Sequence, residues 1–443
     1  MKSTTPRPLK VLKSGPLEGR LSVPGDKSVS HRALMLGALA TGVTRIRGLL
    51  EAEDVLNTAK AVTALGAPAG KTGEVWEVRG RGTGGLREPG APLDFGNSGT
   101  GTRLMMGVIA GHAMTVDLEG DASLSRRPMG RVLKPLKEMG LEVVGDRDTL
   151  PMTVRGTSRL VPITYALPVP SAQVKSAILI AGLMAAGETT VIEREPTRDH
   201  TERMLRYFGA KVHTRVEDGR TLITVAGDAE LEGRDVTVPG DPSSAAFLLS
   251  AALIVPGSDV TVEGVLVNET RTGLYTTLKD MGGDVELLNP REEGGEPVAD
   301  IRARYSRLKG VRVPAIRAPS MIDEYPVLAA VAAFASGDTV MEGLAELKVK
   351  ESDRLAATAE GLLANGVRAA VDGDTLVVHG ASRKVPGGGT VATHLDHRIA
   401  MAFLTLGLAS EAPVTVDDTT MIATSFPEFR GLMETLGAAY ASV

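Results

Sequence analysis

Charged and hydroxyl side chains stand at the start of an apolar segment that otherwise has the composition of a buried helix. The segment PGDKSVSHRALMLGALATG, residues 24–42, is rich in Ala, Leu and Met, yet its beginning carries Lys27, Ser28 and Arg32. Ser28 and Arg32 are four residues apart and therefore share one helical face, with Lys27 just before them. Because the first N–H groups of a helix are unpaired and its dipole is positive there, this pattern favours binding of a phosphate or a carboxylate.

Four more apolar segments begin with polar residues in the same way. Those residues are Asn97, Ser98, Gly99 and Thr100; Ser171 and Gln173; Asp323 and Glu324; and Asp396, His397 and Arg398. Two further segments add charged side chains, which are Arg126 and Arg127 in SRRPMGR and Lys350, Glu351 and Arg354 in KVKESDR. Helix starts of this kind, gathered around one cleft, would form an anion site in a chain whose net charge is −5.

Several of these residues also have a purely structural interpretation. Ser28 and Ser171 would each serve as a helix cap, and His31 would serve as a packing or hydrogen-bonding residue. In KVKESDR, Lys350 and Arg354 share one helical face, which is also the pattern of an exposed charged helix with i,i+4 pairs. The pair of histidines at 394 and 397 lacks the carboxylate and thiol partners of a metal site, so we reject a metal there.

Two nucleotide-binding motifs are matched only in part. GRGTGG at residues 80–85 fits the dinucleotide pattern G-x-G-x-x-G, but the following LREPGAPLDFG is interrupted by prolines and is not a helix. PGDKS resembles the end of a Walker A loop, but Asp26 stands where that loop requires glycine. Both interpretations fail.

Six segments share one design, namely a polar opening, an apolar run of helical length and a β-prone stretch. They occupy residues 24–42, 96–111, 170–187, 239–257, 319–337 and 395–410. Their spacing of roughly 70–80 residues suits a βαβαββ unit. Each is followed by an amphipathic segment that ends in glycine, for example RVLKPLKEMG, and glycine there predicts a left-handed stop to a helix. The sequence therefore predicts an α/β protein of six similar units.

A longer repeat groups these units in threes. SVPGDKS at residues 22–28 is echoed by TVPGDPS at residues 237–243, about half the chain away. This echo predicts a first domain of three units over residues 21–238. A second domain would cover residues 239–443 and also include residues 1–20. The charged helix starts would then line a substrate cleft between the two domains.

The bulk composition limits the class of protein. The 443 residues are 43% hydrophobic, 23% charged and only 3% aromatic, which is typical of globular proteins and offers little stacking surface for bases. The negative net charge gives no general attraction for nucleic acid or an anionic membrane. The absence of cysteine excludes disulfides, thiolate metal sites and a cysteine nucleophile. The N-terminus has no hydrophobic signal core, and no apolar run is long enough to cross a bilayer, so a cytoplasmic protein is expected.

Taken together, the motifs resemble those of one enzyme family. PGDKSVSHRA, GNSGTGTRLM, SRRPMGR, PSAQVKSA, EPTRDHTE, SMIDEYP, VKESDR and DHRIAMAF resemble, in their order, the motifs of the 5-enolpyruvylshikimate-3-phosphate synthase family over nearly the full chain. The resemblance implies transfer of the enolpyruvyl group of phosphoenolpyruvate to the 5-hydroxyl of shikimate 3-phosphate, with release of phosphate. It also implies two similar domains of the enolpyruvyl transferase type, an inside-out α/β barrel, that close around the substrates. No metal or cofactor is implied, and a monomer is expected.

The resemblance assigns roles to residues of the matched motifs. Lys27 is similar to a lysine that touches phosphoenolpyruvate, and Ser28 and Arg32 are similar to ligands of the shikimate phosphate. The residues that match the phosphoenolpyruvate side are Gly99, Arg127, Arg354 and Arg398. The residues that match the shikimate side are Ser171, Ala172, Gln173, Asp323 and Lys350, and Gln173 would reach both substrates. Arg198 is expected to be a further phosphate contact.

The implied reaction needs a base and an acid. The attacking hydroxyl must lose a proton, and the enol methylene must gain one. Asp323 is our candidate base, and Glu351 is our candidate acid, a role that requires surroundings that raise its pKa. Lys27 is a competing acid. Arginine is suited to holding a carboxylate or a phosphate by two parallel hydrogen bonds.

The C-terminal region departs from the better-known bacterial pattern of this family. That pattern has a lysine before the late Phe-Pro pair, whereas this chain has Thr424 and Ser425 in MIATSFPEF. This departure resembles the second class of the family, which includes glyphosate-tolerant members. Some tolerant members carry alanine at the position of Gly99, so we expect this chain to be at least moderately sensitive to glyphosate.

Two alternative functions share part of this pattern. One is the enolpyruvyl transferase that acts on UDP-N-acetylglucosamine, which usually carries a loop cysteine that this chain lacks. The other is a non-catalytic protein that retains the fold and binds a phosphorylated ligand. It predicts that some of the charged site residues are lost, and this sequence retains them.

Overall fold

The structure, a computed structural model, describes residues 5–382 and 384–442. The chain divides into two compact units that do not follow one another simply along the sequence. Unit 1 comprises Met1–Pro24, Gly240–Arg291 and Pro297–Val443. Unit 2 comprises Gly25–Pro239 and Glu292–Glu296. Each unit has a hydrophobic core of its own.

Among the described residues, six apolar helices form the centre of these cores, three in each unit, and they are the helices expected from the repeat. In unit 2 they are α1 (Lys27–Leu39), α3 (Gly99–Ala110) and α5 (Ala172–Gly182). In unit 1 they are α7 (Pro242–Ile254), α9 (Tyr325–Ala332) and α11 (His397–Gly407). Ala, Leu and Met have high helix propensity, and every residue of α7 is buried. The prediction of six buried helices is confirmed.

An amphipathic helix follows each buried helix along the chain. These helices are α2 (Glu53–Ala64), α4 (Gly130–Met139), α6 (His200–Tyr207), α8 (Gly273–Asp280), α10 (Arg354–Ala364) and α12 (Phe429–Thr435). The glycine just beyond each one has a positive φ; those glycines are Gly66, Gly140, Gly209, Gly282, Gly366 and Gly437. A side chain strongly disfavours this backbone region. The predicted glycine stops are therefore confirmed.

Unit 2 contains three four-stranded sheets and one short pair of strands. The first sheet has the order β16 (Asp235–Thr237), β4 (Val43–Arg47), β6 (Val75–Arg79) and β5 (Ala69–Thr72). The second has the order β7 (Leu93–Asp94), β8 (Thr115–Glu119), β10 (Met152–Arg155) and β9 (Glu142–Val144). The third has the order β11 (Thr164–Ala166), β12 (Glu188–Glu193), β14 (Arg220–Ala226) and β13 (Val212–Glu217). The pair is β15 (Leu231–Glu232) with β3 (Ala40–Thr41).

The part of unit 1 that the structure describes also contains three four-stranded sheets. The first has the order β18 (Asp284–Glu293), β19 (Glu296–Arg304), β17 (Asp259–Leu266) and β2 (Glu18–Ser22). The second has the order β20 (Arg312–Val313), β21 (Ser336–Met341), β23 (Thr375–Ala381) and β22 (Ala369–Asp372). The third has the order β24 (Thr390–Val391), β25 (Val414–Val416), β1 (Leu9–Val11) and β26 (Tyr440–Ser442).

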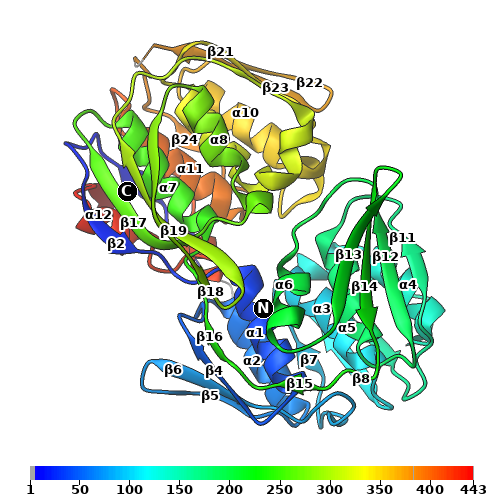
Figure 1. The fold of residues 1–443 in the computed structure, drawn as a ribbon. Coiled ribbons are helices and arrows are strands. Elements are labelled where there is room, and N and C mark those ends of the chain that lie inside the picture. The colour runs from blue at the N-terminus through cyan, green and yellow to red at the C-terminus, as the bar shows by residue number, and fades with distance from the viewer. Residues whose placement is uncertain (1–4, 383, 443) are drawn as a thin grey trace. The chain divides into compact units, whose positions relative to one another are not determined.

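All six four-stranded sheets combine one parallel pair with a neighbouring antiparallel pair. The parallel pairs are β16–β4, β7–β8, β11–β12, β2–β17, β20–β21 and β24–β25. In five of these pairs a buried helix directly precedes the later strand along the chain, as a parallel connection requires. The pair β16–β4 differs, because α1 precedes β4 and the chain reaches β16 only near the end of the unit. Within each unit the apolar helices lie inside and the sheets lie toward the periphery (Figure 1). The start of each buried helix is thus held on a repeated scaffold.

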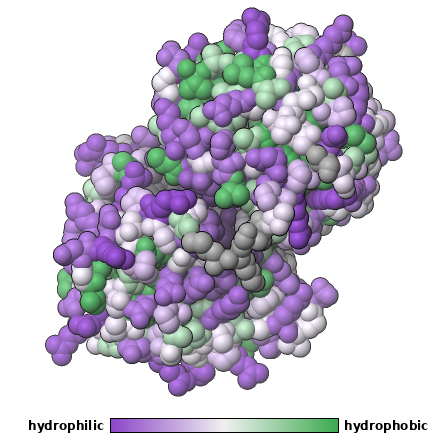
Figure 2. Space-filling view, turned by 180° about the vertical axis from the view of Figure 1, so that it is seen from behind, coloured by the Kyte–Doolittle hydropathy of each residue, from purple (hydrophilic) through white to green (hydrophobic). Residues whose placement is uncertain are grey.

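The surface carries mainly hydrophilic residues on the face shown in Figure 2, where hydrophobic residues occur in scattered small groups. Within residues 5–382 and 384–442, none of the helices combines the length and the apolar character that a bilayer crossing needs.

Candidate active site

The start of α1 is fixed by an aspartate that the sequence analysis did not single out as a cap. Asp26 Oδ1 accepts a hydrogen bond from Val29 N at 2.8 Å and caps the helix, so the interpretation of Ser28 as that cap is wrong. Lys27 follows directly, and its Nζ lies 3.3 Å from Asp54 Oδ2. Both side chains are partly exposed, at 21% and 12%. The Lys27 ammonium group and the hydroxyl of Ser28, which is also partly exposed, therefore stand at this helix start.

Arg32 lies one turn further along α1 and is almost fully buried. Its guanidinium donates to Thr201 Oγ1 at 2.7 Å, to Ser176 Oγ at 2.8 Å and to Ser28 O at 2.9 Å. Burial lowers the pKa of Arg32 to about 10, because nearby carboxylates, chiefly that of Glu202, only partly compensate for desolvation. The group is therefore still charged at neutral pH.

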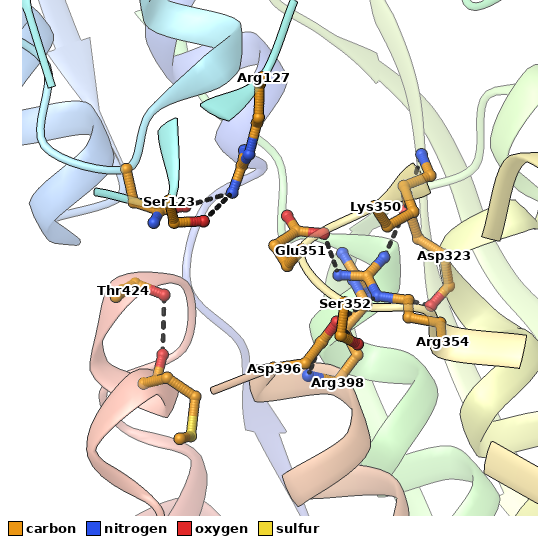
Figure 3. A network of polar contacts seen from close by, with 12 residues as sticks. Ser123, Arg127, Asp323, Lys350, Glu351, Ser352, Arg354, Asp396, Arg398 and Thr424 are labelled. Atoms are coloured by element: carbon orange, nitrogen blue, oxygen red, sulfur yellow. Dashed lines mark hydrogen bonds and ion pairs between the residues drawn. The ribbon is translucent and has the colours of Figure 1, made fainter. Parts of the chain in front are cut away.

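The start of α3 brings a glycine and an arginine together. Ser98 caps this helix by accepting from Gly101 N, and Gly99 is its first residue. A Cβ placed on Gly99 would lie 3.3 Å from Arg127 Nη1. Arg127 Nη2 donates to Asn97 Oδ1 at 2.6 Å and to Ser123 Oγ at 3.2 Å (Figure 3). The absence of a side chain at 99 thus leaves room beside a guanidinium group.

The start of α5 is joined to α3 by side-chain hydrogen bonds. Ser171 caps α5 by accepting from Val174 N, as its structural interpretation predicted, and Ala172 follows it. Gln173 Nε2 donates to Thr100 Oγ1 at 2.9 Å, and Gln173 Oε1 accepts from Arg103 Nη1 at 2.8 Å. Both ends of the Gln173 amide are therefore held by α3.

In unit 1, one buried arginine gathers three carboxylates. The Arg354 side chain is 1% exposed, and it donates to Glu351 Oε2 at 2.5 Å, Asp396 Oδ2 at 2.8 Å and Asp323 Oδ1 at 3.1 Å (Figure 3). Burial disfavours its charge, but Glu351, Asp396 and Asp323 outweigh that effect and raise the pKa of Arg354 above its ordinary value. Ser352 Oγ also donates to Asp396 Oδ2, at 3.0 Å. Arg354 is the centre of a fixed charge network.

Two more cations adjoin this network through Asp323. Lys350 Nζ lies 3.5 Å from Asp323 Oδ1. Arg398 Nη1 donates to Asp323 O at 3.3 Å and lies 3.6 Å from Glu324 Oε1. Lys350 and Arg354 both contact Oδ1 of the Asp323 carboxylate, which is 14% exposed and therefore still meets solvent. Such a carboxylate can accept a proton from a bound hydroxyl.

The structure overturns the alternative interpretation of KVKESDR as an exposed helix. Helix α10 begins only at Arg354, because Asp353 accepts from Ala356 N and caps it. Lys350 and Glu351 therefore lie in the preceding turn and not on the helix, and Arg354 points into the buried network instead of toward solvent.

A comparison with protein-family models now identifies the arrangement. Residues 11–433 match the model described as EPSP synthase (3-phosphoshikimate 1-carboxyvinyltransferase). The chain belongs to the EPSP synthase family. This membership confirms the expected 3-phosphoshikimate 1-carboxyvinyltransferase activity of the shikimate pathway.

Individual relatives of the EPSP synthase family agree over the whole chain. A 3-phosphoshikimate 1-carboxyvinyltransferase of Parvibaculum lavamentivorans is 62% identical over 432 residues, covering 96% of this chain and 95% of the relative. The corresponding protein of Brucella suis biovar 1 is 58% identical over 442 residues, covering 99% and 98%. A solved structure of EPSP synthase from Acinetobacter baumannii has a TM-score of 0.89 at 43% identity, covering 98% of this chain and all of that chain.

A more distant structure shares the fold alone. The enolpyruvyl transferase NikO from Streptomyces tendae has a TM-score of 0.78 at 20% identity and covers 99% of both chains. Taken with the family match, these similarities favour the EPSP synthase family over the alternative enzyme that acts on UDP-N-acetylglucosamine.

The sites expected for an EPSP synthase separate into two groups, one in each unit. Unit 1 brings together Asp323, Lys350, Glu351, Arg354 and Arg398. Unit 2 holds Lys27, Ser28, Arg32, Gly99, Arg127, Ser171, Ala172, Gln173 and Arg198. Within unit 2, Arg127 lies beside the open space at Gly99, and hydrogen bonds link Gln173 to α3. No individual role was predicted for Asp54, Asp396, Glu324 or Arg103, although the last three stand in the motifs DHRIAMAF, SMIDEYP and GNSGTGTRLM. No three His, Cys, Asp or Glu side chains of the described residues are grouped to hold a metal ion.

His31 is a buried, hydrogen-bonding residue, as the sequence predicted. Its ring is fully buried, and Nδ1 lies 2.8 Å from Thr58 Oγ1. Burial, with help from the positive charges of Lys27 and Arg32, lowers the pKa of His31 to about 3. The ring is therefore neutral at physiological pH.

This shift predicts a specific dependence of stability on pH. Between the ordinary pKa of 6.5 and the folded-state value of about 3, the unfolded chain binds a proton that the folded chain does not. Stability should therefore fall as the pH drops through this window, by up to about 1.4 kcal/mol per pH unit from this group. Urea titrations at pH 7.5 and 5.5 measure the unfolding free energy of each protein. We expect this free energy to fall less between pH 7.5 and 5.5 in His31→Asn than in the unmodified protein. Parallel losses in the two proteins would contradict the prediction.

Proposed function

We propose that the protein transfers the enolpyruvyl group of phosphoenolpyruvate to the 5-hydroxyl of shikimate 3-phosphate by addition and elimination. In the addition, the enol methylene gains a proton and the 5-oxygen, losing its own proton, bonds to C2. In the elimination, the new methyl group loses a proton as the C2–O bond to phosphate breaks, so that phosphate leaves and the enol ether forms. Support comes from the family match and from the charged side chains at the helix starts.

In unit 2 we propose binding roles for the charged and polar helix starts. Ser28, Arg32 and Arg198 would hold the shikimate phosphate, and the α5 start would hold the rest of that substrate, by the residues Ser171, Ala172 and Gln173. Lys27, Gly99 and Arg127 would contact phosphoenolpyruvate. The unpaired N–H groups of α3 and α5 favour anions because their caps are uncharged serines.

In unit 1 we propose the acid–base groups and further anion ligands. Asp323 would accept the proton of the 5-hydroxyl, with Lys350 beside it on the same side of the substrate. Arg354 and Arg398 would bind phosphoenolpyruvate. Glu351 would donate the proton to the methylene, and Lys27 of unit 2 is the alternative donor. The observation that carries this proposal is the meeting of Asp323, Lys350, Glu351, Arg354 and Arg398 in one network.

A phosphate-release assay tests the proposed reaction. We expect phosphate to appear only when phosphoenolpyruvate and shikimate 3-phosphate are both present, in equal amount to the phosphoenolpyruvate consumed. UDP-N-acetylglucosamine should not replace shikimate 3-phosphate. Release with the nucleotide sugar, or no release with either acceptor, would overturn the proposal.

We further propose that the chain belongs to the second class of the family and that each unit is a domain of three βαβαββ units. The class assignment is supported by Thr424 and Ser425 before Phe426, and the domain assignment by the three similar sheets in each unit. The cytoplasmic location and the monomeric state stay predictions.

The open space at Gly99 predicts that the protein is sensitive to glyphosate. A methyl group there would lie 3.0 Å from Arg103 Nη1 and 3.3 Å from Arg127 Nη1, so both flexible guanidinium groups would have to shift. We expect glyphosate to inhibit the unmodified protein at concentrations near the KM for phosphoenolpyruvate. Gly99→Ala should raise the inhibition constant by at least about tenfold, because one misplaced methyl group in a tight site has an effect of this size.

The matched control for this prediction is Gly90→Ala. Gly90 is exposed, and a Cβ there would meet no atom within 4 Å. Inhibition of the unmodified protein only far above the KM for phosphoenolpyruvate would contradict the expected sensitivity. Equal inhibition constants for Gly99→Ala and Gly90→Ala would contradict the role of the open space.

A further inference from the structure

A buried lysine in unit 2 has no part in the reaction described above. Lys175 lies in the first turn of the apolar helix α5, and its side chain is 1% exposed. Its Nζ is 2.7 Å from Glu202 Oε1 and 3.1 Å from Glu193 Oε2, and both carboxylates are buried as well. Burying three charges is costly, and apolar residues would fill the same space without that cost. The network therefore calls for an explanation beyond packing.

The first connection of this network leads to the segment that carries Arg198. Glu193 ends strand β12 on its buried face, and α6 begins at His200. Between them, Thr197 O accepts from Lys175 Nζ at 3.4 Å, and Thr197 Oγ1 donates to Glu193 Oε1. The residue directly before Arg198 is thus held by its backbone and by its side chain.

The second connection leads to Arg32. Ser176 follows Lys175 on α5, and Thr201 precedes Glu202 on α6. These two hydroxyl groups accept from Arg32 Nη2 and Nε, and they are 2.6 Å from one another. The ion pair between Lys175 and Glu202 therefore fastens together the two helical turns that orient the Arg32 guanidinium.

The electrostatics show that Arg32 and Arg198 are near one another. Burial is the largest influence on the pKa of Arg32, and nearby carboxylates oppose it. The positive charge of Arg198 is a smaller cause that also lowers this pKa. Two neighbouring guanidinium groups repel, and a bound dianion would relieve that repulsion. Burial raises the pKa of Glu202, and the charge and hydrogen bond of Lys175 act against this shift.

We propose that Lys175 is a positioning residue that holds Arg32 and Arg198 in place for the phosphate group of shikimate 3-phosphate. It acts on Arg198 through Glu193 and Thr197, and on Arg32 through Glu202 and the α6 start. The inference rests on the proposed phosphate-binding roles of these two arginines. Lys175 itself touches no substrate.

The test compares binding and turnover in Lys175→Met. Because a phosphate that does not react is held equally in the ground and transition states, the variant should raise the KM for shikimate 3-phosphate by about tenfold or more while kcat changes little. The KM for phosphoenolpyruvate should not change. Calorimetric titration with shikimate 3-phosphate alone should show the same loss of affinity, and this measurement does not depend on the enzyme turning over. Lys137→Met, an exposed lysine on α4, is the control and should leave both constants unchanged.

Two further variants keep the proposal testable if Lys175→Met folds poorly. Thr197→Val removes the hydroxyl that binds Glu193 and should raise the KM for shikimate 3-phosphate in the same direction by a smaller factor. In Lys175→Met combined with Glu202→Gln, the Glu202 carboxylate that lost its cation is removed as well. This double variant should recover folding stability but not the affinity for shikimate 3-phosphate. If the double variant had the KM of the unmodified protein, Lys175 would serve only to neutralise the charge of Glu202, and the proposal would be overturned. Unchanged affinity for shikimate 3-phosphate in folded Lys175→Met, or an equal rise in the KM for phosphoenolpyruvate, would also overturn it. Failure of the unmodified protein to release phosphate while it still binds shikimate 3-phosphate would refute the proposed reaction instead.

Discussion

Asp323→Ala is expected to lower kcat by about a thousandfold, within the range found for loss of a general base. The carboxylate is partly exposed, and Lys350 and Arg354 fix its position on one side. Without it, the network loses the carboxylate that we propose as the acceptor of the proton of the attacking hydroxyl. The measurement is phosphate release at saturating shikimate 3-phosphate and phosphoenolpyruvate, which reports kcat directly.

Two comparisons separate the base from its structural contacts. Asp323→Asn keeps the shape of the side chain and an oxygen that can accept from Arg354, but it removes the basic group, so we expect nearly the same loss. Asp338→Ala alters an exposed aspartate of unit 1 that pairs with His379, and it should leave kcat unchanged. If Asp323→Asn keeps most of the activity, another group takes the proton.

The repeated helices could be predicted from sequence because their signals are local. Runs of Ala, Leu and Met set the six buried helices, and a glycine just beyond each amphipathic helix provides the left-handed stop, as at Gly140 and Gly366. Some residues of the candidate site could also be singled out from the sequence, since residues such as Lys27 and Arg398 stand at the starts of those helices. Local chemistry therefore determined the positions of most elements.

The partners of those residues could not be predicted, because they come from distant parts of the chain. Asp396 meets Arg354 across 42 positions, and Asp54 meets Lys27 across 27. An isolated aspartate in a sequence is also indistinguishable from a helix cap, which is the second role of Asp396. The start of α10 was misplaced for a related reason, since the pattern did not show that Asp353 would cap the helix after Glu351.

The caps also change how the helix starts are to be understood. Three of the six buried helices, α1, α7 and α11, are capped by the aspartates Asp26, Asp241 and Asp396. Each carboxylate uses a backbone N–H group and adds a negative charge where the dipole would attract an anion. At these starts, affinity for an anion must therefore come from cations such as Lys27 and Arg398. The serine-capped helices α3 and α5 leave the dipole available.

Arg354→Met is expected to reduce both stability and activity. The guanidinium is almost completely buried and accounts for the close approach of three carboxylates. Removing it leaves the buried Asp396 without its cation, and breaking a buried pair in this way typically costs about 3–5 kcal/mol. Urea unfolding of the variant and the unmodified protein at pH 7.5 measures this loss. Arg354→Met combined with Asp396→Asn should recover part of it, because the uncompensated charge is then gone.

The pH dependence of the same variant distinguishes loss of charge pairing from loss of packing. Burial alone would raise the pKa of Asp396, but the pair with Arg354 outweighs it and the net shift is downward. A lowered pKa stabilises the folded protein above the unfolded-state value of 3.8, and that contribution is lost as the pH falls through the folded-state value. Without Arg354 the shift should reverse, so that the folded variant takes up a proton more readily than its unfolded chain. The difference in unfolding free energy between Arg354→Met and the unmodified protein should therefore shrink as the pH is lowered from 7.5 toward 4.5. A difference that stays constant would mean that Arg354 stabilises the fold mainly by filling space.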